Sequence, residues 1–173
     1  PHPNYNRILL SPVLAGEKKI EYIILNPLEW YREKGVTLHT SDPIVEIDRV
    51  RRIVRSRSGL KVPYDRLLIA AGSNPVILPI PGSDLDGVVT FRDLQDVDTM
   101  LQATRTHRKA VVIGGGLLGL EAANGLLKQG MDVTVVHIFD TLMERQLDRA
   151  AAELLRESLE RRGLKFIMAT KTA

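Results

Sequence analysis

The spacing of apolar residues differs between the first and the second half of the chain. In the first half, short runs rich in β-branched residues occupy residues 44–47, 52–55 and 60–62. Turn-forming residues separate these runs, among them the pair Ser58-Gly59. Short β-prone runs with turn signals between them are typical of neighbouring antiparallel strands. The pattern therefore predicts an antiparallel β-meander.

In the second half, apolar runs alternate with longer segments whose apolar residues recur at helical spacing. The expected strands are 110–113, 132–136 and 164–168, and the expected helices are 117–129 and 148–162. A glycine follows each helix, where a left-handed backbone closes the last turn. Strand–helix–strand–helix–strand predicts an α/β fold with a Rossmann-like, doubly wound parallel sheet.

Proline, glycine and capping residues mark the remaining elements. We expect a short helix over 29–34 that ends at Gly35, followed by a short strand over 36–39. A further helix is expected to begin at Asp93, a good N-cap residue. The continuous apolar run 67–71 ends at a glycine and predicts a buried parallel strand.

The stretch 72–87 is the natural linker, because it holds three prolines and three glycines. A chain of 173 residues is long enough for one ordinary domain or two small ones. We therefore expect two parts, with the meander in residues 1–90 and the parallel sheet in residues 91–173.

The composition narrows the possible chemistry. Hydrophobic residues make up 44% of the chain and charged residues 26%, which is typical of a soluble globular protein. The absence of cysteine excludes a disulfide, a thiol nucleophile and cysteine-ligated zinc or iron–sulfur centres from these residues. The four histidines match no metal-ligand spacing, so we expect no metal site. No apolar run is long enough to cross a membrane and the start lacks a secretory signal, so we expect a cytoplasmic protein without a membrane partner.

A cluster of arginines beside the meander raises the question of nucleic-acid binding. The cluster consists of Arg49, Arg51, Arg52, Arg55 and Arg57. No aromatic residues interleave with them for base stacking. We therefore interpret the cluster as a solvated strand face and expect no nucleic-acid partner.

A glycine-rich loop follows the expected strand that ends at Ile113. Gly114-Gly115-Gly116-Leu117-Leu118-Gly119 has the pattern G-x-G-x-x-G and opens a helix. In this motif the first glycine makes the tight turn, the second lets the backbone approach a pyrophosphate, and the third lets helix and strand pack closely. The helix N-terminus then offers N–H groups and a partial positive charge. The unit predicts a nicotinamide dinucleotide site, and the alternative is a glycine-rich turn without a ligand.

The residue at the end of the second expected strand does not follow the simplest version of this motif. An acid is expected there, about 20 residues into the unit, to bind the ribose hydroxyls. The chain has His137 instead. An imidazole could donate to a hydroxyl or face a 2′-phosphate, so NAD and NADP are not distinguished; the alternative is a partly exposed residue at a strand end. Asp140 could serve the ribose instead, but we interpret it as a loop residue.

Glu121 lies two residues past the third glycine of the loop, in the first turns of the expected helix. The helix dipole favours an acid in this position, which is one explanation for it. The other is that its carboxylate reaches the nicotinamide end of a bound cofactor.

Four stretches together carry a resemblance to a known family. They are residues 1–11, 64–75 followed by 80–82, 114–121, and 142–148. Their order and spacing resemble the FAD- and NAD(P)H-binding oxidoreductases of the pyridine nucleotide–disulfide reductase superfamily, and in particular the large-subunit branch of NAD(P)H-dependent nitrite reductases. The resemblance covers essentially the whole chain.

The resemblance implies which residues contact each cofactor. For FAD, it implies that Arg7 pairs with the pyrophosphate and that the Ile44 backbone lies near the adenine. It also implies that Ala71 and Gly72 pass close to the phosphates and ribose, and that Arg92 lies near the flavin. For NAD(P)H, it implies a site lined by Gly114, Gly116, Leu117, Gly119, Glu121 and His137. The chain departs from the family at Ala71, where a threonine is usual, and at His137, where an acid is usual.

The resemblance also implies that this chain is the middle of a flavoprotein module. The family's first glycine loop, its later Gly-Asp segment and its cofactor-binding cysteines have no counterpart here. Residues 1–90 would then be a partial FAD-binding domain and residues 91–173 a partial NAD(P)-binding domain. The rest of the same polypeptide, and a small subunit, are the implied partners.

The implied activity belongs to nitrate assimilation. NAD(P)H would reduce FAD, and nitrite would be reduced to ammonia elsewhere in the full protein, through iron–sulfur centres and sirohaem. We expect no catalytic acid or base here and no turnover by the segment alone. One alternative is a reductase that serves rubredoxin or ferredoxin. Another is a non-catalytic dinucleotide-binding module, which predicts that Arg7 and Arg92 lie far from a common pocket.

Overall fold

The computed structural model describes residues 2–172, and the chain forms two compact units. The first unit reaches to Asn6 and continues over Ile24–Ser73. The second unit holds Arg7–Ile23 and continues from Asn74 to the end of the chain. The ranges 1–90 and 91–173 are the FAD-binding and NAD(P)-binding domains that the sequence predicts. They are not the same as these two units, and the division into cofactor domains stays a prediction.

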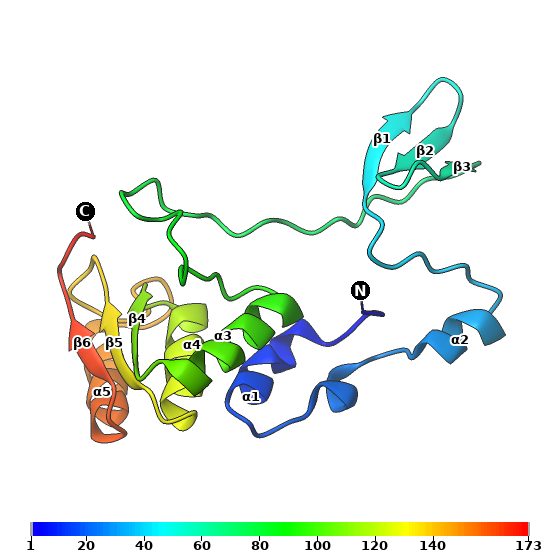
Figure 1. Cartoon of the computed structure of the whole chain (residues 1–173). Coiled ribbons are helices and arrows are strands. Elements are labelled where there is room, and N and C mark those ends of the chain that lie inside the picture. The colour runs from blue at the N-terminus through cyan, green and yellow to red at the C-terminus, as the bar shows by residue number, and fades with distance from the viewer. Residues whose placement is uncertain (1, 173) are drawn as a thin grey trace. The chain divides into compact units, whose positions relative to one another are not determined.

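The first unit contains a three-stranded antiparallel sheet (Figure 1). Its strands are β1 (Ile44–Asp48), β2 (Ile53–Ser56) and β3 (Lys61–Pro63), paired in the order β1-β2-β3. The short helix α2 (Leu28–Glu33) precedes them. The predicted meander is therefore confirmed.

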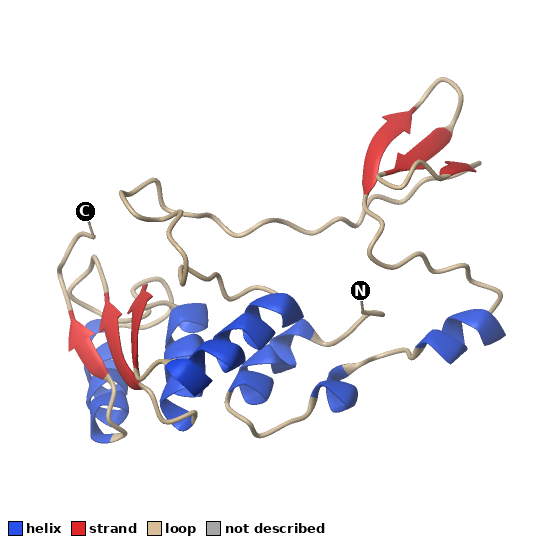
Figure 2. Ribbon diagram, in the orientation of Figure 1, coloured by secondary structure: helices blue, strands red, loops and turns tan. Residues whose placement is uncertain are grey.

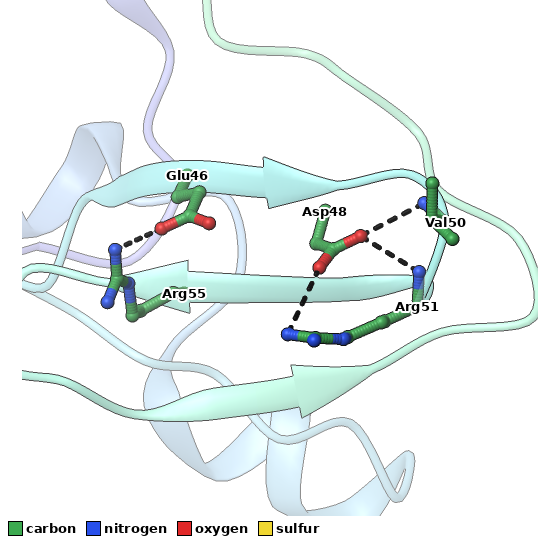
Figure 3. A network of polar contacts seen from close by, with 5 residues as sticks. All are labelled: Glu46, Asp48, Val50, Arg51 and Arg55. Carbon is green, nitrogen blue, oxygen red and sulfur yellow. Dashed lines mark hydrogen bonds and ion pairs between the residues drawn. The ribbon is translucent and has the colours of Figure 1, made fainter.

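Polar contacts close the turn between β1 and β2 (Figure 3). The Asp48 carboxylate accepts hydrogen bonds from the backbone N–H groups of Val50, at 3.0 Å, and Arg51, at 2.8 Å. Glu46 forms an ion pair with Arg55 on the neighbouring strand. All five arginines of the cluster are exposed. Their exposure agrees with a solvated surface, although only Arg55 lies on a strand, and the absence of a nucleic-acid partner stays a prediction.

Two predicted strands do not form. Residues 36–39 and 67–71 have no regular secondary structure, and no described residue pairs with them in a ladder. Leu68 is 89% exposed and Ile69 is 68% exposed, so the second of these runs is also not buried. An apolar run becomes a strand only when a neighbouring strand satisfies its N–H and C=O groups. The prediction of a buried parallel strand was wrong for this reason.

The second unit contains the parallel sheet (Figures 1 and 2). Its strands, β4 (Lys109–Ile113), β5 (Asp132–Val136) and β6 (Lys165–Ile167), are ordered β4-β5-β6. Helix α4 (Leu117–Lys128) connects β4 to β5, and helix α5 (Arg149–Arg161) connects β5 to β6. The predicted strand–helix alternation and the parallel sheet are confirmed.

Helix α3 (Leu94–Thr106) begins where the sequence predicts. The Asp93 carboxylate accepts from the backbone N–H groups of Gln95 and Asp96, at 2.9 and 3.0 Å. The Asp96 side chain reaches back to the Asp93 N–H, which completes a capping box. This cap fixes the residues that come just before α3.

An N-terminal segment packs into the second unit. It comprises the 3-10 turn Arg7–Leu9, helix α1 (Leu10–Leu14) and the 3-10 turn Ile20–Ile23. Leu14 is fully buried against α4, where a Cβ atom on Gly125 would lie 2.7 Å from Leu14 Cγ. The Gln129 side chain also donates to the Leu14 carbonyl at 2.8 Å. These contacts bring residues near the start of the chain to the face of α4.

No helix within residues 2–172 is both long and apolar enough to cross a membrane.

Candidate functional site

The glycine loop lies between the end of β4 and the start of α4. The Gly114 N–H donates to the Val136 carbonyl at 2.9 Å, and Gly114 has φ +119°. A Cβ atom on Gly119 would lie 2.0 Å from the Gly114 carbonyl oxygen. Because that distance is far below a van der Waals contact, α4 can approach the loop this closely only with glycine at position 119.

Gly116 has a different environment from Gly119. It is the N-cap of α4, with φ −84° and ψ 178°, and a Cβ atom there would meet nothing within 4 Å. The packing of the chain therefore does not itself require glycine at this position. The space that a side chain would fill lies beside the first turn of α4.

The N-terminus of α4 lacks a side-chain cap, whereas Asp93 caps α3 and Asp148 caps α5. The first N–H groups of a helix have no partner within the helix, and they carry the positive end of its dipole. An anionic group beside Gly116 would satisfy them. The loop therefore fits a phosphate, both in its open space and in its donors.

His137 lies beneath this loop. Its Nδ1 atom accepts a hydrogen bond of 3.0 Å from the Gly115 backbone N–H, and the residue is only 6% exposed. The alternative of a partly exposed residue at a strand end is therefore wrong. A Cβ atom on Gly115 would lie 2.8 Å from the imidazole ring. The ring thus occupies the space beside the loop because position 115 carries no side chain.

The other ring nitrogen of His137 contacts the segment after β5. Nε2 lies 3.2 Å from Glu144 Oε2. Since Nδ1 accepts from a backbone N–H, the ring proton is on Nε2, and it is donated to the carboxylate. The Met143 N–H also donates to the Gly115 carbonyl at 3.1 Å. The segment after β5 is therefore attached to the glycine loop at two points.

The Asp140 side chain pairs with Arg149 and not with His137 or the glycine loop. Its carboxylate accepts from the Arg149 guanidinium, and this hydrogen bond lowers the pKa of Asp140 below its usual value. Its side chain is 58% exposed. The interpretation of Asp140 as a loop residue agrees with this pairing.

A small hollow of about 170 Å³ lies between the N-terminal segment, the residues just before α3, and α4. It is lined by Arg7, Ile8, Leu10, Ser11, Phe91, Arg92, Leu117, Leu118 and Glu121. The structure therefore brings together four residues that the sequence singled out, namely Arg7, Arg92, Leu117 and Glu121. Two arginines and one glutamate are thus among the residues that line the hollow.

Two contacts fix polar groups in this hollow. Ser11 Oγ donates a hydrogen bond of 2.6 Å to Glu121 Oε2, and the pair is partly buried. The Arg92 backbone N–H donates to Asp96 Oδ2 at 2.7 Å, so Arg92 is held at the start of α3. The first contact joins two side chains that line the hollow, and the second fixes the backbone of Arg92.

Three predicted flavin residues lie in the first unit. Ile44 begins β1 and is 51% exposed. Ala71 and Gly72 are exposed in a segment without regular structure, and Gly72 has φ +68°. Their contacts with FAD stay a prediction.

Sequence reasoning missed Ser11, Gly115 and Glu144. Ser11 and Glu144 both lie in stretches that carry the family resemblance. The partner of Ser11, Glu121, is 110 positions away, and the partner of Glu144 is His137 at the end of β5. Gly115 is an unspecified position of the G-x-G-x-x-G pattern. Its contact with His137 follows only once the loop and β5 lie side by side.

No cluster of three or more His, Asp or Glu side chains that could hold a metal ion occurs among residues 2–172.

Comparison with known protein families gives one match over nearly the whole chain. Residues 2–173 match the family described as pyridine nucleotide-disulphide oxidoreductase.

Individual relatives and structures agree with this match. The chain is 52% identical over 172 residues to a Bacillus subtilis (strain 168) nitrite reductase of the NAD(P)H type, covering 99% of the chain and 21% of that protein. It is 47% identical to the assimilatory nitrate reductase electron transfer subunit of the same organism, covering 99% of the chain and 22% of that protein. The chain thus spans about a fifth of the length of these relatives.

A solved structure of similar fold is the NADH:rubredoxin oxidoreductase of Clostridium acetobutylicum. Its TM-score is 0.86 at 29% sequence identity, over 96% of this chain and 44% of that one.

Proposed function

Because the chain belongs to the pyridine nucleotide-disulphide oxidoreductase family, we propose that it forms the NAD(P)H-binding segment, and part of the FAD-binding segment, of a nitrite reductase. Proteins of this family and its structural neighbours bind FAD and NAD(P)H. The observation that carries the proposal is the uncapped N-terminus of α4 beside Gly116, in a chain 52% identical to an NAD(P)H nitrite reductase.

The glycine loop would hold the dinucleotide pyrophosphate. Gly116 leaves the required space, and the first N–H groups of α4 would donate to the phosphate oxygens. Gly119 allows α4 to begin close to β4, which sets the position of these donors. The Gly115 N–H is already bonded to His137, so it serves the loop rather than a phosphate.

The hollow beside α4 would receive the flavin side of the site. Arg7 and Arg92 provide guanidinium groups, which suit pyrophosphate because they can donate two parallel hydrogen bonds. Glu121, held by Ser11, would face the nicotinamide end. Bound NAD(P)H and FAD supply the hydride donor and the hydride acceptor. The role of this chain is to position the two cofactors, and it supplies no catalytic acid or base for the hydride transfer.

The acceptor of the electrons is proposed from the relatives. Two Bacillus subtilis relatives are named as a nitrite reductase of the NAD(P)H type and as an assimilatory nitrate reductase electron transfer subunit. The chain itself contains no cysteine to bind an iron–sulfur centre. Reduction of nitrite to ammonia would therefore take place in other parts of the full polypeptide, with or without a small subunit.

The two alternatives differ in how they fit the structure. A rubredoxin or ferredoxin reductase remains the second candidate, because the fold resembles a solved NADH:rubredoxin oxidoreductase. A non-catalytic module predicts that Arg7 and Arg92 lie far from a common pocket. Both residues line the same hollow, which argues against that module.

Calorimetric titration of NADH, NADPH and FAD into the chain tests the binding function. We expect a nicotinamide dinucleotide to bind, and we expect no NADH–dye reductase activity when FAD is added to this chain alone. Failure of both NADH and NADPH to bind would refute the proposal. Nitrite-dependent NADH oxidation by the full-length polypeptide tests the acceptor, and reduction of rubredoxin in its place would favour the second candidate.

A further inference from the structure

The acid that usually binds the ribose hydroxyls is absent from the end of β5. The carboxylate of Glu144, from the segment after β5, lies close to that position instead. His137 occupies the strand end, and Glu144 lies 3.2 Å from its Nε2 atom. We propose that Glu144 binds the adenosine ribose hydroxyls and selects NAD(H) over NADP(H), an inference that rests on the proposed dinucleotide-binding function.

His137 holds Glu144 in place. Because Nδ1 accepts from Gly115, the imidazole presents only its Nε2–H to the carboxylate. The side chain of His137 is 7% exposed and that of Glu144 is 27% exposed. One side of the carboxylate is thus anchored to a buried ring, while another part of the side chain reaches the surface.

The segment that carries Glu144 is also attached directly to the glycine loop. The Met143 N–H donates to the Gly115 carbonyl at 3.1 Å, and the neighbouring Leu142 is 1% exposed. A Cβ atom on Gly115 would lie 2.7 Å from Leu142 Cδ2, so the two stretches are in close contact. The carboxylate is therefore held at a defined distance from the loop that would bind the pyrophosphate.

The chemistry of this placement favours NAD(H). A carboxylate accepts hydrogen bonds from both ribose hydroxyls, and it repels a 2′-phosphate. The other two acids of the segment have different roles, because the Asp140 carboxylate is paired with Arg149 and the Asp148 carboxylate caps α5. His137 has both nitrogens engaged, so it acts through Glu144 as a positioning residue.

The test uses two ligands that contain the adenosine ribose but no nicotinamide. ADP-ribose and 2′-phospho-ADP-ribose are titrated by calorimetry into the chain and into Glu144→Gln. We expect the chain to bind ADP-ribose more tightly. Glu144→Gln should reduce this preference by roughly tenfold or more, since a hydrogen bond to a charged group is lost together with a repulsion. Asp140→Asn is the matched control, and it should leave the preference unchanged.

Binding of 2′-phospho-ADP-ribose to the unaltered chain that is as tight as binding of ADP-ribose, or tighter, overturns the assignment. An unchanged preference in Glu144→Gln, or a preference lost in Asp140→Asn, overturns the assignment. If neither ADP-ribose nor NADH binds to the unaltered chain, the proposed function fails, and this assignment fails with it. Circular dichroism checks that the variants fold. Should Glu144→Gln not fold, Glu144→Lys replaces it, and a failure of this variant to favour 2′-phospho-ADP-ribose overturns the proposal.

Discussion

Ser11 and Glu121 are 110 positions apart in the sequence, yet Ser11 Oγ donates a hydrogen bond of 2.6 Å to Glu121 Oε2. The contact joins α1 to the second turn of α4 and orients a carboxylate in the hollow that Arg7 and Arg92 also line. A family motif near the start of the chain and the helix that follows the glycine loop thus contribute to the same site.

Ser11→Ala removes this hydrogen bond and leaves the Glu121 carboxylate without its hydroxyl donor. We expect the free energy of unfolding to fall by about 1–2 kcal/mol, because the bond is partly buried and its acceptor is charged. Urea denaturation measures the change. Ser158→Ala, in helix α5, serves as the control. A stability of Ser11→Ala equal to that of the unaltered chain would contradict this role.

Gly119→Ala places a methyl group 2.0 Å from the Gly114 carbonyl oxygen. The clash involves backbone and cannot be relieved by turning a side chain. We expect a loss of roughly 2–4 kcal/mol in the free energy of unfolding, as for other substitutions that overpack a close contact. Thermal and urea unfolding both report it. A change of less than about 0.5 kcal/mol is typical of surface substitutions. Such a small change would show that α4 does not depend on the close contact between Gly119 and the Gly114 carbonyl oxygen.

The pair of Asp140 and Arg149 makes a pH-dependent contribution to stability. The Arg149 hydrogen bond lowers the pKa of Asp140 in the folded chain. The stabilisation is therefore present above the unfolded value, about pH 4, and is lost as the pH falls through the lower folded value. We expect Asp140→Asn to be less stable than the unaltered chain at pH 7, with the difference shrinking toward pH 2–3, roughly the range below the unfolded pKa, and in high salt. Urea unfolding at several pH values measures this, and a difference that does not change with pH would disprove the coupling.

The parallel sheet and the glycine loop were predictable because they depend on local patterns. The apolar runs around β4 and β5 and the helical spacing between them determine the element types without reference to distant residues. The cap at Asp93 is likewise a local interaction, and it was predicted at the right residue.

The run 67–71 and His137 show where sequence reasoning stops. An apolar run becomes a strand only through pairing, and no described residue pairs with this one. The role of His137 depends on the Gly115 N–H, which lies 22 positions away and reaches the ring only after β4 and β5 are side by side. A strand-end position alone could not show that the ring lies beneath the loop while a separate glutamate approaches its far side.

Titration of NADH into the chain and into Gly116→Ala tests the central claim most directly. A Cβ atom on Gly116 meets nothing within 4 Å, and φ is −84°, so the variant should fold with nearly unchanged stability. If the space beside α4 holds the pyrophosphate, the added methyl group should weaken NADH binding by roughly tenfold or more, the factor that corresponds to about 1.4 kcal/mol. Equal affinity for NADH in a correctly folded Gly116→Ala would contradict the placement of the dinucleotide at this loop.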